Sequence, residues 1–360
     1  MFPFLHEICY YSGMTEKDKF IMEEYRSQKP CYERLETIVA DILQGIAQNS
    51  GLHIYSVSHR IKEEKSLAGK LQRKGDKYSN LQDITDILGA RVVCFFSDEV
   101  DALAQHIESN FSVDWEKSID KRKYLNFNTF GYLSVHYICA LKEGNGYPKE
   151  LMNIHFEIQM CSMMQHIWAV LEHDLGYKTK FGVPNAVKRN FSRLAGLLEI
   201  ADEHVVRIRD DVIKYTKSVH EKIINDDANS IAIDSVSLSE YMDNSKNMKS
   251  FLLAISNICE AEIFNEKPDR YLEQLEWLKK NTLGDLQKML EDNSSLALRM
   301  IEKQLATSEL DILSSTIALR FLCRAELLRK KYPLEQVTDF FLLTMKPDQA
   351  ERAAKKLLKK

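Results

Sequence analysis

Residues 91–96 read Arg-Val-Val-Cys-Phe-Phe, a β-branched and aromatic run that is typical of a buried strand. Further strands are predicted at residues 54–58, 132–141 and 154–160. Helical patterns lie between and after these strands, at residues 62–70, 100–111 and 164–175. Strands that alternate with helices predict a mixed sheet in an α/β or α+β domain.

Helical patterns also flank the predicted sheet on both sides. In the first fifty residues, Pro30 and Gly51 bracket an amphipathic helix. A long helix is predicted from about residue 186 to 220, and the polar stretch 225–239 is interpreted as a linker, although Ile231-Ala232-Ile233 could add a short strand. Helices are then expected near residues 239–263, 269–280, 282–291, 294–305, 307–330, 333–344 and 347–359.

The chain therefore divides into three predicted parts. Residues 1–50 form an N-terminal helical segment, and residues 51–224 form the sheet domain with its trailing helix. Residues 225–360 form an all-helical C-terminal domain, whose apolar faces must be buried within it, against the sheet domain or against a second subunit. We expect this domain to be regulatory, through a ligand, a partner or a homo-oligomer contact.

Composition excludes several classes of protein. A chain of 360 residues with 44% hydrophobic and 28% charged residues is an ordinary globular protein. The net charge of -4 argues against a generic nucleic-acid coat. Seven cysteines without a Cys-x-x-Cys pair indicate reduced, structural thiols. No secretory signal or membrane span is recognisable, so we expect a cytoplasmic protein without a membrane partner.

The first reactive cluster is basic. Arg60 precedes the stretch in which Lys62, Ser66 and Lys70 fall at i, i+4 and i+8, on one face of the predicted helix. Such a face presents two cations with a hydroxyl group between them. A solvated charged face is the alternative, because residues 63–65 are charged as well.

The second cluster lies at the start of the buried strand 91–96. A carboxylate in the position of Asp86 either caps a turn or binds a metal ion. Arg91 would reach the same side as Asp86 and could act there as a phosphate clamp. Gly89 indicates a close approach of the backbone.

Two more clusters alternate along predicted strands. Tyr132, Ser134 and His136 share one strand face, as do Glu157 and Gln159. An aromatic ring and an imidazole on one face suit a purine nucleotide. Together with the basic cluster, the acids predict a magnesium-assisted phosphate-transfer site, in which cations hold a polyphosphate and two carboxylates hold the metal.

The last cluster lies on the helix after the final strand. His166 and His173 converge too poorly for zinc, so Glu172 and His173 are interpreted as supports of the site.

In their order and spacing these clusters resemble the synthetase domain of the RelA/SpoT family. The family pattern R-x-K-x3-S-x3-K is matched by Arg60, Lys62, Ser66 and Lys70, and the pattern D-x4-R is matched by Asp86 and Arg91. The pattern G-Y-x-S-x-H is matched by Gly131, Tyr132, Ser134 and His136, and the pattern E-x-Q is matched by Glu157 and Gln159. Leu171-Glu172-His173 with Tyr177-Lys178 resembles the small stand-alone synthetases. The chain departs from the family at four positions. Asn128 stands where lysine is frequent, and Phe130 stands where asparagine is frequent. Leu133 replaces a frequent arginine or glutamine, and Cys161 replaces a frequent arginine.

The resemblance implies an α+β fold of the nucleotidyltransferase type, with a mixed β-sheet flanked by helices. It implies transfer of pyrophosphate from ATP to the 3′-hydroxyl of GDP or GTP, which makes ppGpp or pppGpp. The implied ATP-binding residues are Arg60, Lys62, Ser66, Lys70 and Arg91. Asp86 and Glu157 would bind Mg²⁺, with Glu157 also a proton acceptor, and Tyr132, Ser134, His136 and Gln159 would bind the acceptor. Glu172, His173 and Lys178 would support the site.

Two other functions remain open on the sequence. A toxin-like relative would pyrophosphorylate the 3′ end of tRNA, for which Lys188, Arg189, Arg193, Arg207 and Arg209 could supply a basic surface. An ordinary charged helix face is the alternative for these five residues. A nucleotide-binding regulator without catalysis is the third possibility, although both carboxylates and the phosphate-binding cations are present.

Overall fold

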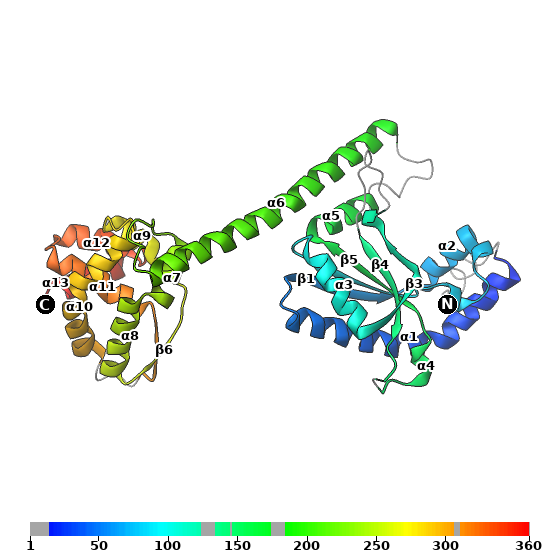
Figure 1. The fold of residues 1–360 in the computed structure, drawn as a ribbon, viewed down its shortest axis with the longest axis horizontal. Coiled ribbons are helices and arrows are strands. Elements are labelled where there is room, and N and C mark those ends of the chain that lie inside the picture. Colours follow the sequence, from blue (N-terminus) through cyan, green and yellow to red (C-terminus); the bar gives the residue numbers. More distant parts are fainter. Residues whose placement is uncertain (1–13, 124–133, 145, 174–183, 306–309, 360) are drawn as a thin grey trace, which may run out of the picture. The chain divides into compact units, whose positions relative to one another are not determined.

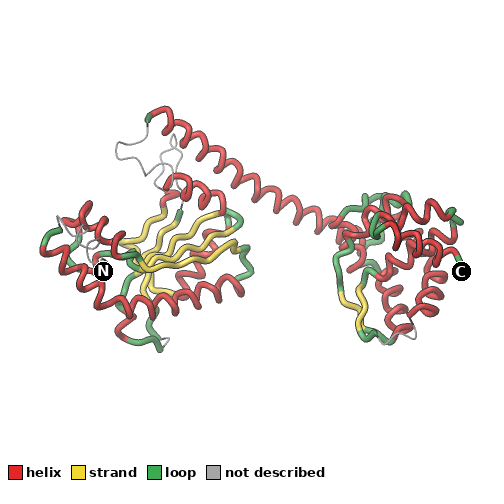
Figure 2. The backbone as a smooth tube through the Cα atoms, turned by 180° about the vertical axis from the view of Figure 1, so that it is seen from behind, coloured by secondary structure: helices red, strands yellow, loops and turns green. Residues whose placement is uncertain are grey.

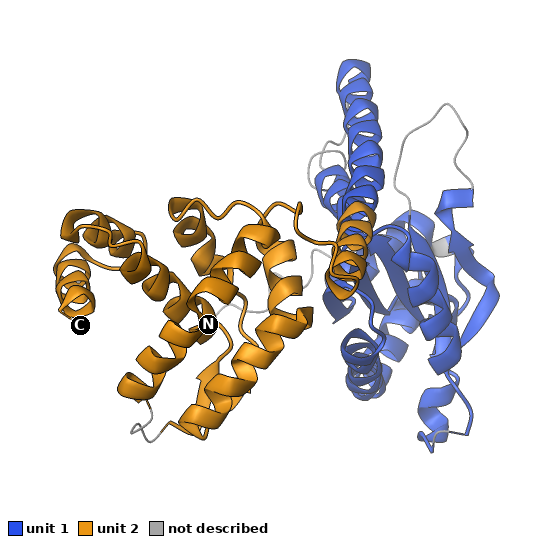
Figure 3. Cartoon of the chain, turned by 60° about the vertical axis from the view of Figure 1, so that its left-hand side comes forward, with its two compact units in different colours: residues 1–209 blue, residues 210–360 orange. Residues whose placement is uncertain are grey.

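A computed structural model describes residues 14–123, 134–144, 146–173, 184–305 and 310–359. The chain divides into two compact units, residues 1–209 and 210–360 (Figure 3). The division falls inside one long helix, α6 (Asn185–Ile224), whose last residues belong to the second unit. None of the helices in the described ranges has the length and apolar character of a membrane span.

The first unit is built on a five-stranded sheet in the order β1-β2-β5-β4-β3 (Figures 1 and 2). Its strands are β1 (Ile54–Ile61), β2 (Leu88–Cys94), β3 (Phe111–Asp120), β4 (Val135–Leu141) and β5 (Phe156–Ser162). The β2–β5 pair is parallel and the other pairs are antiparallel, so the sheet is mixed, as predicted. The helices of this unit are α1 (Glu16–Asn49), α2 (Glu64–Lys74), α3 (Glu99–Asn110), α4 (Lys149–Met152), α5 (Met163–Leu171) and most of α6.

Several strands differ from the sequence prediction, and β2, for example, runs from Leu88 to Cys94 rather than over residues 91–96. β1 continues to Ile61, three residues beyond its predicted end, because it pairs with β2 over its whole length. β3 was not predicted, since this edge strand is interrupted by charged residues such as Asp114 and Glu116. Charge on an edge strand hides the period-two pattern from which a strand is recognised.

Alternating residues separate the two faces of the sheet. Ala90, Val92, Ile158 and Met160 are buried in one hydrophobic core together with residues of α1 and α3. Their neighbours in sequence therefore point to the opposite face, against which α5 packs through contacts with β2 and β5. Buried cysteines such as Cys94 belong to this core, as expected, and burial raises the pKa of its thiol to about 12.

The N-terminal helix is longer than predicted. We expected Pro30 to mark its start, but α1 runs from Glu16 through Pro30. A proline removes one helical hydrogen bond and costs about 3 kcal/mol in a helix interior. Tyr25 and Tyr32, on either side of Pro30, are buried in the core, and this packing holds the helix together across the proline.

The second unit is a helical domain with one short parallel sheet. Its helices are α7 (Ser235–Asn244), α8 (Lys246–Cys259), α9 (Leu272–Trp277), α10 (Leu283–Leu305), α11 (Ile317–Arg329), α12 (Leu334–Leu342) and α13 (Pro347–Leu358), and a 3-10 turn, η5 (Asp269–Tyr271), precedes α9. Strand β6 (Glu262–Phe264) pairs with β7 (Ile312–Ser314). Neither strand was predicted, because each is only three residues long.

Capping side chains explain where the predicted helices of this unit were wrong. The predicted linker extends to residue 239, but α7 already begins at Ser235 because Asp234 caps it through the backbone N–H of Ser237. The helix predicted at 239–263 is divided at Ser245, which caps α8. The two helices predicted at 282–291 and 294–305 are one continuous helix.

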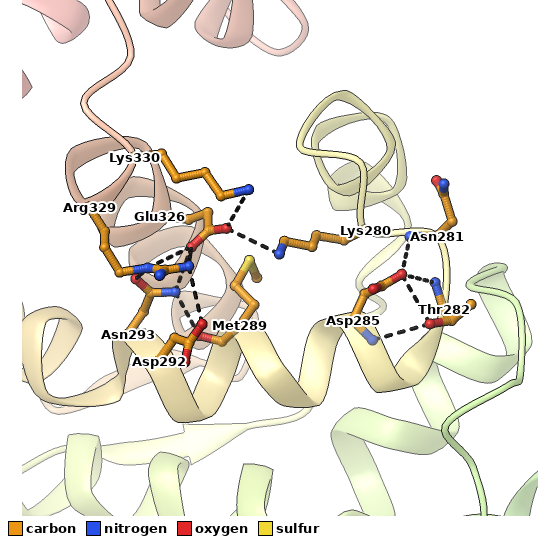
Figure 4. Close-up of polar contacts among 10 residues, drawn as sticks. All are labelled: Lys280, Asn281, Thr282, Asp285, Met289, Asp292, Asn293, Glu326, Arg329 and Lys330. Atoms are coloured by element: carbon orange, nitrogen blue, oxygen red, sulfur yellow. Dashed lines mark hydrogen bonds and ion pairs between the residues drawn. The ribbon is translucent and has the colours of Figure 1, made fainter.

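A buried carboxylate on α11, Glu326, accepts a hydrogen bond from Asn293 on α10 (Figure 4). Glu326 is 0% exposed, and its Oε1 atom lies 3.1 Å from Lys280 Nζ and 3.2 Å from Lys330 Nζ. Its Oε2 atom accepts hydrogen bonds from Asn293 Nδ2 and Arg329 Nη2, both at 2.8 Å. Burial opposes ionisation, but these partners outweigh it and lower the pKa of Glu326 to about 2.

Candidate active site

The sheet face that does not carry the core collects the predicted site residues in two rows. In one row, Gly89 pairs with Arg60 on β1 and with Glu157 on β5. In the next, Gln159 pairs with Arg91 on β2 and with His136 on β4. Strand register therefore places these side chains on one surface, although they are up to about a hundred residues apart in sequence.

A cavity of about 420 Å³ lies over these rows. It is lined by Ser58, His59, Arg60, Lys62, Asp86, Gly89, Ala90, Arg91, Glu157, Gln159, Ala169, Val170 and His173. Strands β1, β2 and β5 form its floor, and α5 with the residues that follow it forms one wall. Nothing lies within 4 Å of the position that a Cβ atom on Gly89 would take, so the missing side chain leaves room in the cavity.

At one end of the cavity, Asp86 is held by two lysines. Lys70 Nζ donates to Asp86 Oδ1 at 2.7 Å, and Lys62 Nζ lies 3.1 Å from Asp86 Oδ2. Burial opposes ionisation of this carboxyl group, but the two lysines outweigh it and lower the pKa of Asp86 below its ordinary value. Asp86 is therefore a carboxylate at neutral pH, poised between two cations.

The predicted helix face through Lys62, Ser66 and Lys70 is only partly present. Lys62 lies in the connection between β1 and α2, where the Tyr25 hydroxyl group donates to its carbonyl oxygen at 2.7 Å. Ser66 is exposed on α2 and does not line the cavity. The strand extends further than predicted, and this is why Lys62 precedes the helix.

Deeper in the sheet, a hydrogen-bonded chain fixes Glu157. His136 Nδ1 lies 2.8 Å from Glu157 Oε1, and Gln159 Nε2 donates to Glu157 Oε2 at 2.8 Å. Burial opposes ionisation here too, but the partners His136 and Gln159 outweigh it and lower the pKa of Glu157. His136 Nε2 contacts Ser134 Oγ at 2.7 Å, and both residues are buried beside the cavity rather than lining it.

Arg91 is anchored on the cavity floor. Its Nη2 and Nε atoms donate to Gln159 Oε1 at 2.8 and 3.1 Å, and its Nη1 atom lies 3.3 Å from His166 Nδ1. Burial and the charge of Arg91 lower the pKa of His166, so the imidazole is neutral at pH 7. His166 thus positions the guanidinium group, a role that the sequence did not indicate, because a single histidine on a helix carries no pattern.

The remaining predicted residues are placed in part. His173 lines the cavity, and Glu172 is exposed beside it. Tyr132 and Lys178 lie outside the described residues, as do Asn128, Phe130 and Leu133. Cys161 is buried on β5, at the family position where arginine is frequent.

Comparison with known proteins identifies the sheet unit. Residues 59–181 match the family model described as the region found in RelA / SpoT proteins. This segment is a RelA/SpoT region. The matched residues contain every one of the predicted site residues.

Two curated relatives of this RelA/SpoT region come from Bacillus subtilis (strain 168). GTP pyrophosphokinase YjbM is 27% identical over 163 residues, which cover 43% of this chain and 72% of YjbM. GTP pyrophosphokinase YwaC is 26% identical over 206 residues, which cover 54% of this chain and 94% of YwaC. Among solved structures, small alarmone synthetase 1 from Bacillus subtilis is 23% identical, with 53% of this chain and 99% of that chain covered and a TM-score of 0.45.

One further cation of the RelA/SpoT region was missed by the sequence analysis. Lys121 follows β3 and is half-buried. Burial lowers the pKa of its ammonium group, although the negative charges of Glu157 and Glu172 act to raise that pKa. It therefore lies within electrostatic reach of both carboxylates. In the sequence it belongs to the run Lys121-Arg122-Lys123, which has the appearance of a solvated charged turn.

The carboxylates of the RelA/SpoT region suit a magnesium ion that is completed by substrate. Asp86 and Glu157 line the same cavity, and the charge of Asp86 acts against ionisation of the Glu157 carboxyl group. Among the described residues, no three Asp, Glu, His or Cys side chains form a ready-made metal cage. Mg²⁺ commonly takes one or two carboxylates plus phosphate oxygens and water, so Asp86 and Glu157 are the residues that could hold it.

Proposed function

We propose that this protein transfers the pyrophosphoryl group of ATP to the 3′-hydroxyl of GDP or GTP and so makes ppGpp or pppGpp. The observation that carries the proposal is the single cavity in which Arg60, Lys62 and Arg91 surround the carboxylates of Asp86 and Glu157. Positioning and charge stabilisation are the main work of a phosphoryl-transfer enzyme, and these residues supply both. The two GTP pyrophosphokinases to which the chain is similar support GDP or GTP as the acceptor.

In this mechanism the cationic side chains bind the phosphates of ATP. Arg91 is fixed by Gln159 and His166, so its guanidinium group is oriented before substrate arrives. Lys62 and Lys70 would exchange part of their contact with Asp86 for phosphate oxygens. A magnesium ion held by Asp86 and Glu157 would neutralise charge that develops on the transferred group.

Glu157 is the proposed proton acceptor. The 3′-oxygen of the acceptor forms a bond to the β-phosphorus of ATP, the bond from that phosphorus to the α,β-bridging oxygen breaks, and AMP leaves. The hydroxyl proton passes to Glu157, which its hydrogen bonds keep ionised at neutral pH. His136 holds the Glu157 carboxylate in place and is itself held by Ser134, so in this structure these two residues position the base.

Acceptor recognition by Tyr132 and Gln159 is part of the same proposal. Gln159 borders the cavity, and Tyr132 precedes β4, which pairs with the strand of Glu157. A tRNA acceptor is the second candidate. Two of the five arginines and lysines that could form its basic surface are paired with carboxylates, since Arg207 lies 3.2 Å from Glu203 and Arg209 lies 2.6 Å from Asp98. We therefore favour the free nucleotide.

The same proposal includes a cytoplasmic enzyme whose C-terminal residues 225–360 regulate the rate through a ligand, a partner or a second copy of the chain. The reaction's substrates, ATP and GDP or GTP, are cytoplasmic metabolites. Size-exclusion chromatography with light scattering, with and without nucleotides, measures whether homo-oligomers form.

A product assay tests the proposed acceptor. The full chain is incubated with β-labelled radioactive ATP and Mg²⁺, together with GDP, GTP or deacylated tRNA in parallel, and the products are separated by chromatography. Label in ppGpp or pppGpp is expected. Label confined to tRNA would replace the proposal with the tRNA reaction, and no transfer to any acceptor would favour the regulator without catalysis. Removal of Mg²⁺ with EDTA should stop the reaction, and added Mg²⁺ should restore it.

A further inference from the structure

The C-terminal unit contains a basic, ring-lined cavity of its own. Its volume is about 320 Å³. It is lined by Arg270, Tyr271, Gln274, Arg320, Arg324, Phe340, Phe341, Thr344 and Met345. These residues come from η5, α9, α11, α12 and the turn after α12, all within residues 210–360.

Helix α11 directs two arginines into this cavity. The helix is buried on almost every side, and the side chains that are not buried are Arg320, Arg324, Leu328 and Arg329. Arg320 and Arg324 stand four residues apart and therefore on the same face, where like charges repel. Only a narrow face of this helix is not buried, and two arginines lie on it. That face therefore carries a concentrated positive charge.

That charge has no carboxylate counter-ion among the described residues of the unit. In the part of the chain that the structure describes, no hydrogen bond or ion pair joins Arg320 or Arg324 to a carboxylate. Arg270 differs, because it lies 3.4 Å from Glu266 and donates to Thr316. Burial, and after it the charge of Arg320, lowers the pKa of Arg324 to about 10, so the group is still cationic at neutral pH.

Elsewhere on the same helix the charges are matched. Glu326 is surrounded by Lys280, Arg329 and Lys330, as Figure 4 shows. A buried charge is costly unless it is paired, and this unit pairs the one that it buries at Glu326. Arg324 is half-buried and has no carboxylate partner among the described residues, so its charge and that of the exposed Arg320 beside it are open to an anion from outside the chain.

The rest of the lining suits a planar group next to that anion. Tyr271, Phe340 and Phe341 are buried and line the cavity with rings. The Arg324 guanidinium group lies 5.6 Å from the centre of the Phe341 ring, a cation–π contact that orients it without removing its charge. Gln274 and Thr344, joined by a 3.0 Å hydrogen bond, add polar groups at the border.

We propose that this cavity is a second nucleotide site, which binds a nucleoside diphosphate with its phosphates at Arg320 and Arg324 and its base against the rings. Paired guanidinium groups are the preferred protein partners of phosphate, and aromatic rings stack on bases. The volume is at the lower end of the range for small-ligand cavities, roughly 300–1,000 Å³, which suits one nucleotide. The site is separate from the proposed catalytic cavity, since it is built wholly from residues of the other unit.

Methyl NMR on the full chain gives a readout that is local to this cavity. Met345 lines it, and its methyl resonance can be assigned in ¹³C-methionine-labelled protein with the variant Met345→Leu. GDP, ADP and inorganic pyrophosphate are titrated into the wild type, into Arg320→Gln/Arg324→Gln and into the control Arg352→Gln. Arg352 is an exposed arginine on α13 that does not line the cavity, so the control matches the change in side chain.

In the wild type and in the control, GDP or ADP should shift the Met345 resonance until the shift saturates. In the double variant the dissociation constant from the same titration should be at least tenfold higher. The other methionine resonances of the double variant should stay at their wild-type positions, which shows that it is folded. If they move, the single variant Arg320→Gln, at an exposed position, replaces it.

Three outcomes would overturn the proposal. The Met345 resonance is unaffected by millimolar nucleotide, or its shift survives the loss of both arginines, or inorganic pyrophosphate binds as tightly as GDP and ADP. The last result would reduce the cavity to a simple anion site in which the rings make no contribution.

Discussion

Glu157 is the residue on which the proposed chemistry depends most directly. It shares the cavity with Asp86 and accepts hydrogen bonds on both oxygens, so its position is fixed while its charge is kept. The substitution Glu157→Gln retains the shape of the side chain but removes its charge and basicity. We predict that transfer falls at least roughly 10²-fold, the usual contribution of a general base, while ATP still binds.

Lys62 and Lys70 together lower the pKa of Asp86, and a change at Lys70 tests this effect. The pKa of Asp86 is depressed in the folded protein, so its ionised form, which the site requires, is present above that pKa and is lost as the pH falls through it. Lys70→Met should raise this pKa and move the acidic limb of the kcat/KM profile to higher pH. The exposed residue Lys74, on the same helix, is the matched control, and Lys74→Met should leave the limb in place. A limb that does not move in either variant would assign it to another group.

At this scale the sequence predicted side chains that follow a period and missed those that do not. Glu157, Gln159 and His136 were found because alternation along a strand places them on one face. Lys121 and His166 reach the site from a turn and a helix, and their placement depends on tertiary packing that no local pattern records. The helical position predicted for Lys62 was wrong because it depends on the residue at which the strand ends and the helix begins.

At the scale of elements, α1 offers a test of how packing overrides local preference. Pro30 is exposed in the middle of this helix, and it deprives the helix of one hydrogen bond. We predict that Pro30→Ala raises the free energy of unfolding by about 1–3 kcal/mol, measured by urea denaturation. Gly45 lies on the same helix, and nothing lies within 4 Å of the methyl group that Gly45→Ala adds, so this variant should raise the free energy of unfolding by about 0.5–1 kcal/mol. A loss of stability in Pro30→Ala would show that the core requires the proline.

The sheet was the most predictable element because strong periodicity and burial agree in it. Strands β2 and β5 alternate buried apolar residues with the polar residues of the site face, and β4 is buried over almost its whole length. Helix boundaries in the C-terminal unit were less predictable, since a cap such as Asp234 or Ser245 is one polar residue among many.

At the scale of the whole molecule, Glu326 should control the stability of the C-terminal unit. Removing one partner of a buried ion pair costs about 3–5 kcal/mol, because the other charges are left without compensation. Glu326→Ala should therefore lower the midpoint temperature of the calorimetric unfolding transition of this unit and leave the midpoint of the sheet unit unchanged. The control Glu351→Ala, which breaks an exposed pair with Lys355, should change stability far less. Equal effects of the two variants would contradict the buried network.

Acid should unfold this unit through the same residue. The pKa of Glu326 falls from an ordinary value of 4.5 to about 2 on folding. Because the folded pKa is depressed, the stabilisation is complete above pH 4.5 and is lost as the pH falls toward about 2. Denaturation curves of the wild type and Glu326→Ala should therefore converge across this range, and curves that stay parallel would exclude the carboxylate as the cause.

The division into two units gives a further prediction about regulation. Because the proposed catalytic cavity is built wholly from residues of the sheet unit, we predict that a variant ending at Ile224 folds, binds ATP and carries out transfer at an altered rate. If that variant is folded and binds ATP but transfers nothing under any condition, the C-terminal unit is part of the catalytic machinery and the regulatory role is wrong.

The most direct test of the central claim combines a single-turnover transfer assay with an ATP-binding measurement on the wild type and Glu157→Gln. The wild type, mixed with limiting β-labelled ATP, Mg²⁺ and excess GDP, should convert the label to ppGpp. Glu157→Gln should bind ATP with similar affinity and form no labelled product on the same time scale. Equal product from both proteins would contradict the assignment of Glu157 and of the cavity around it.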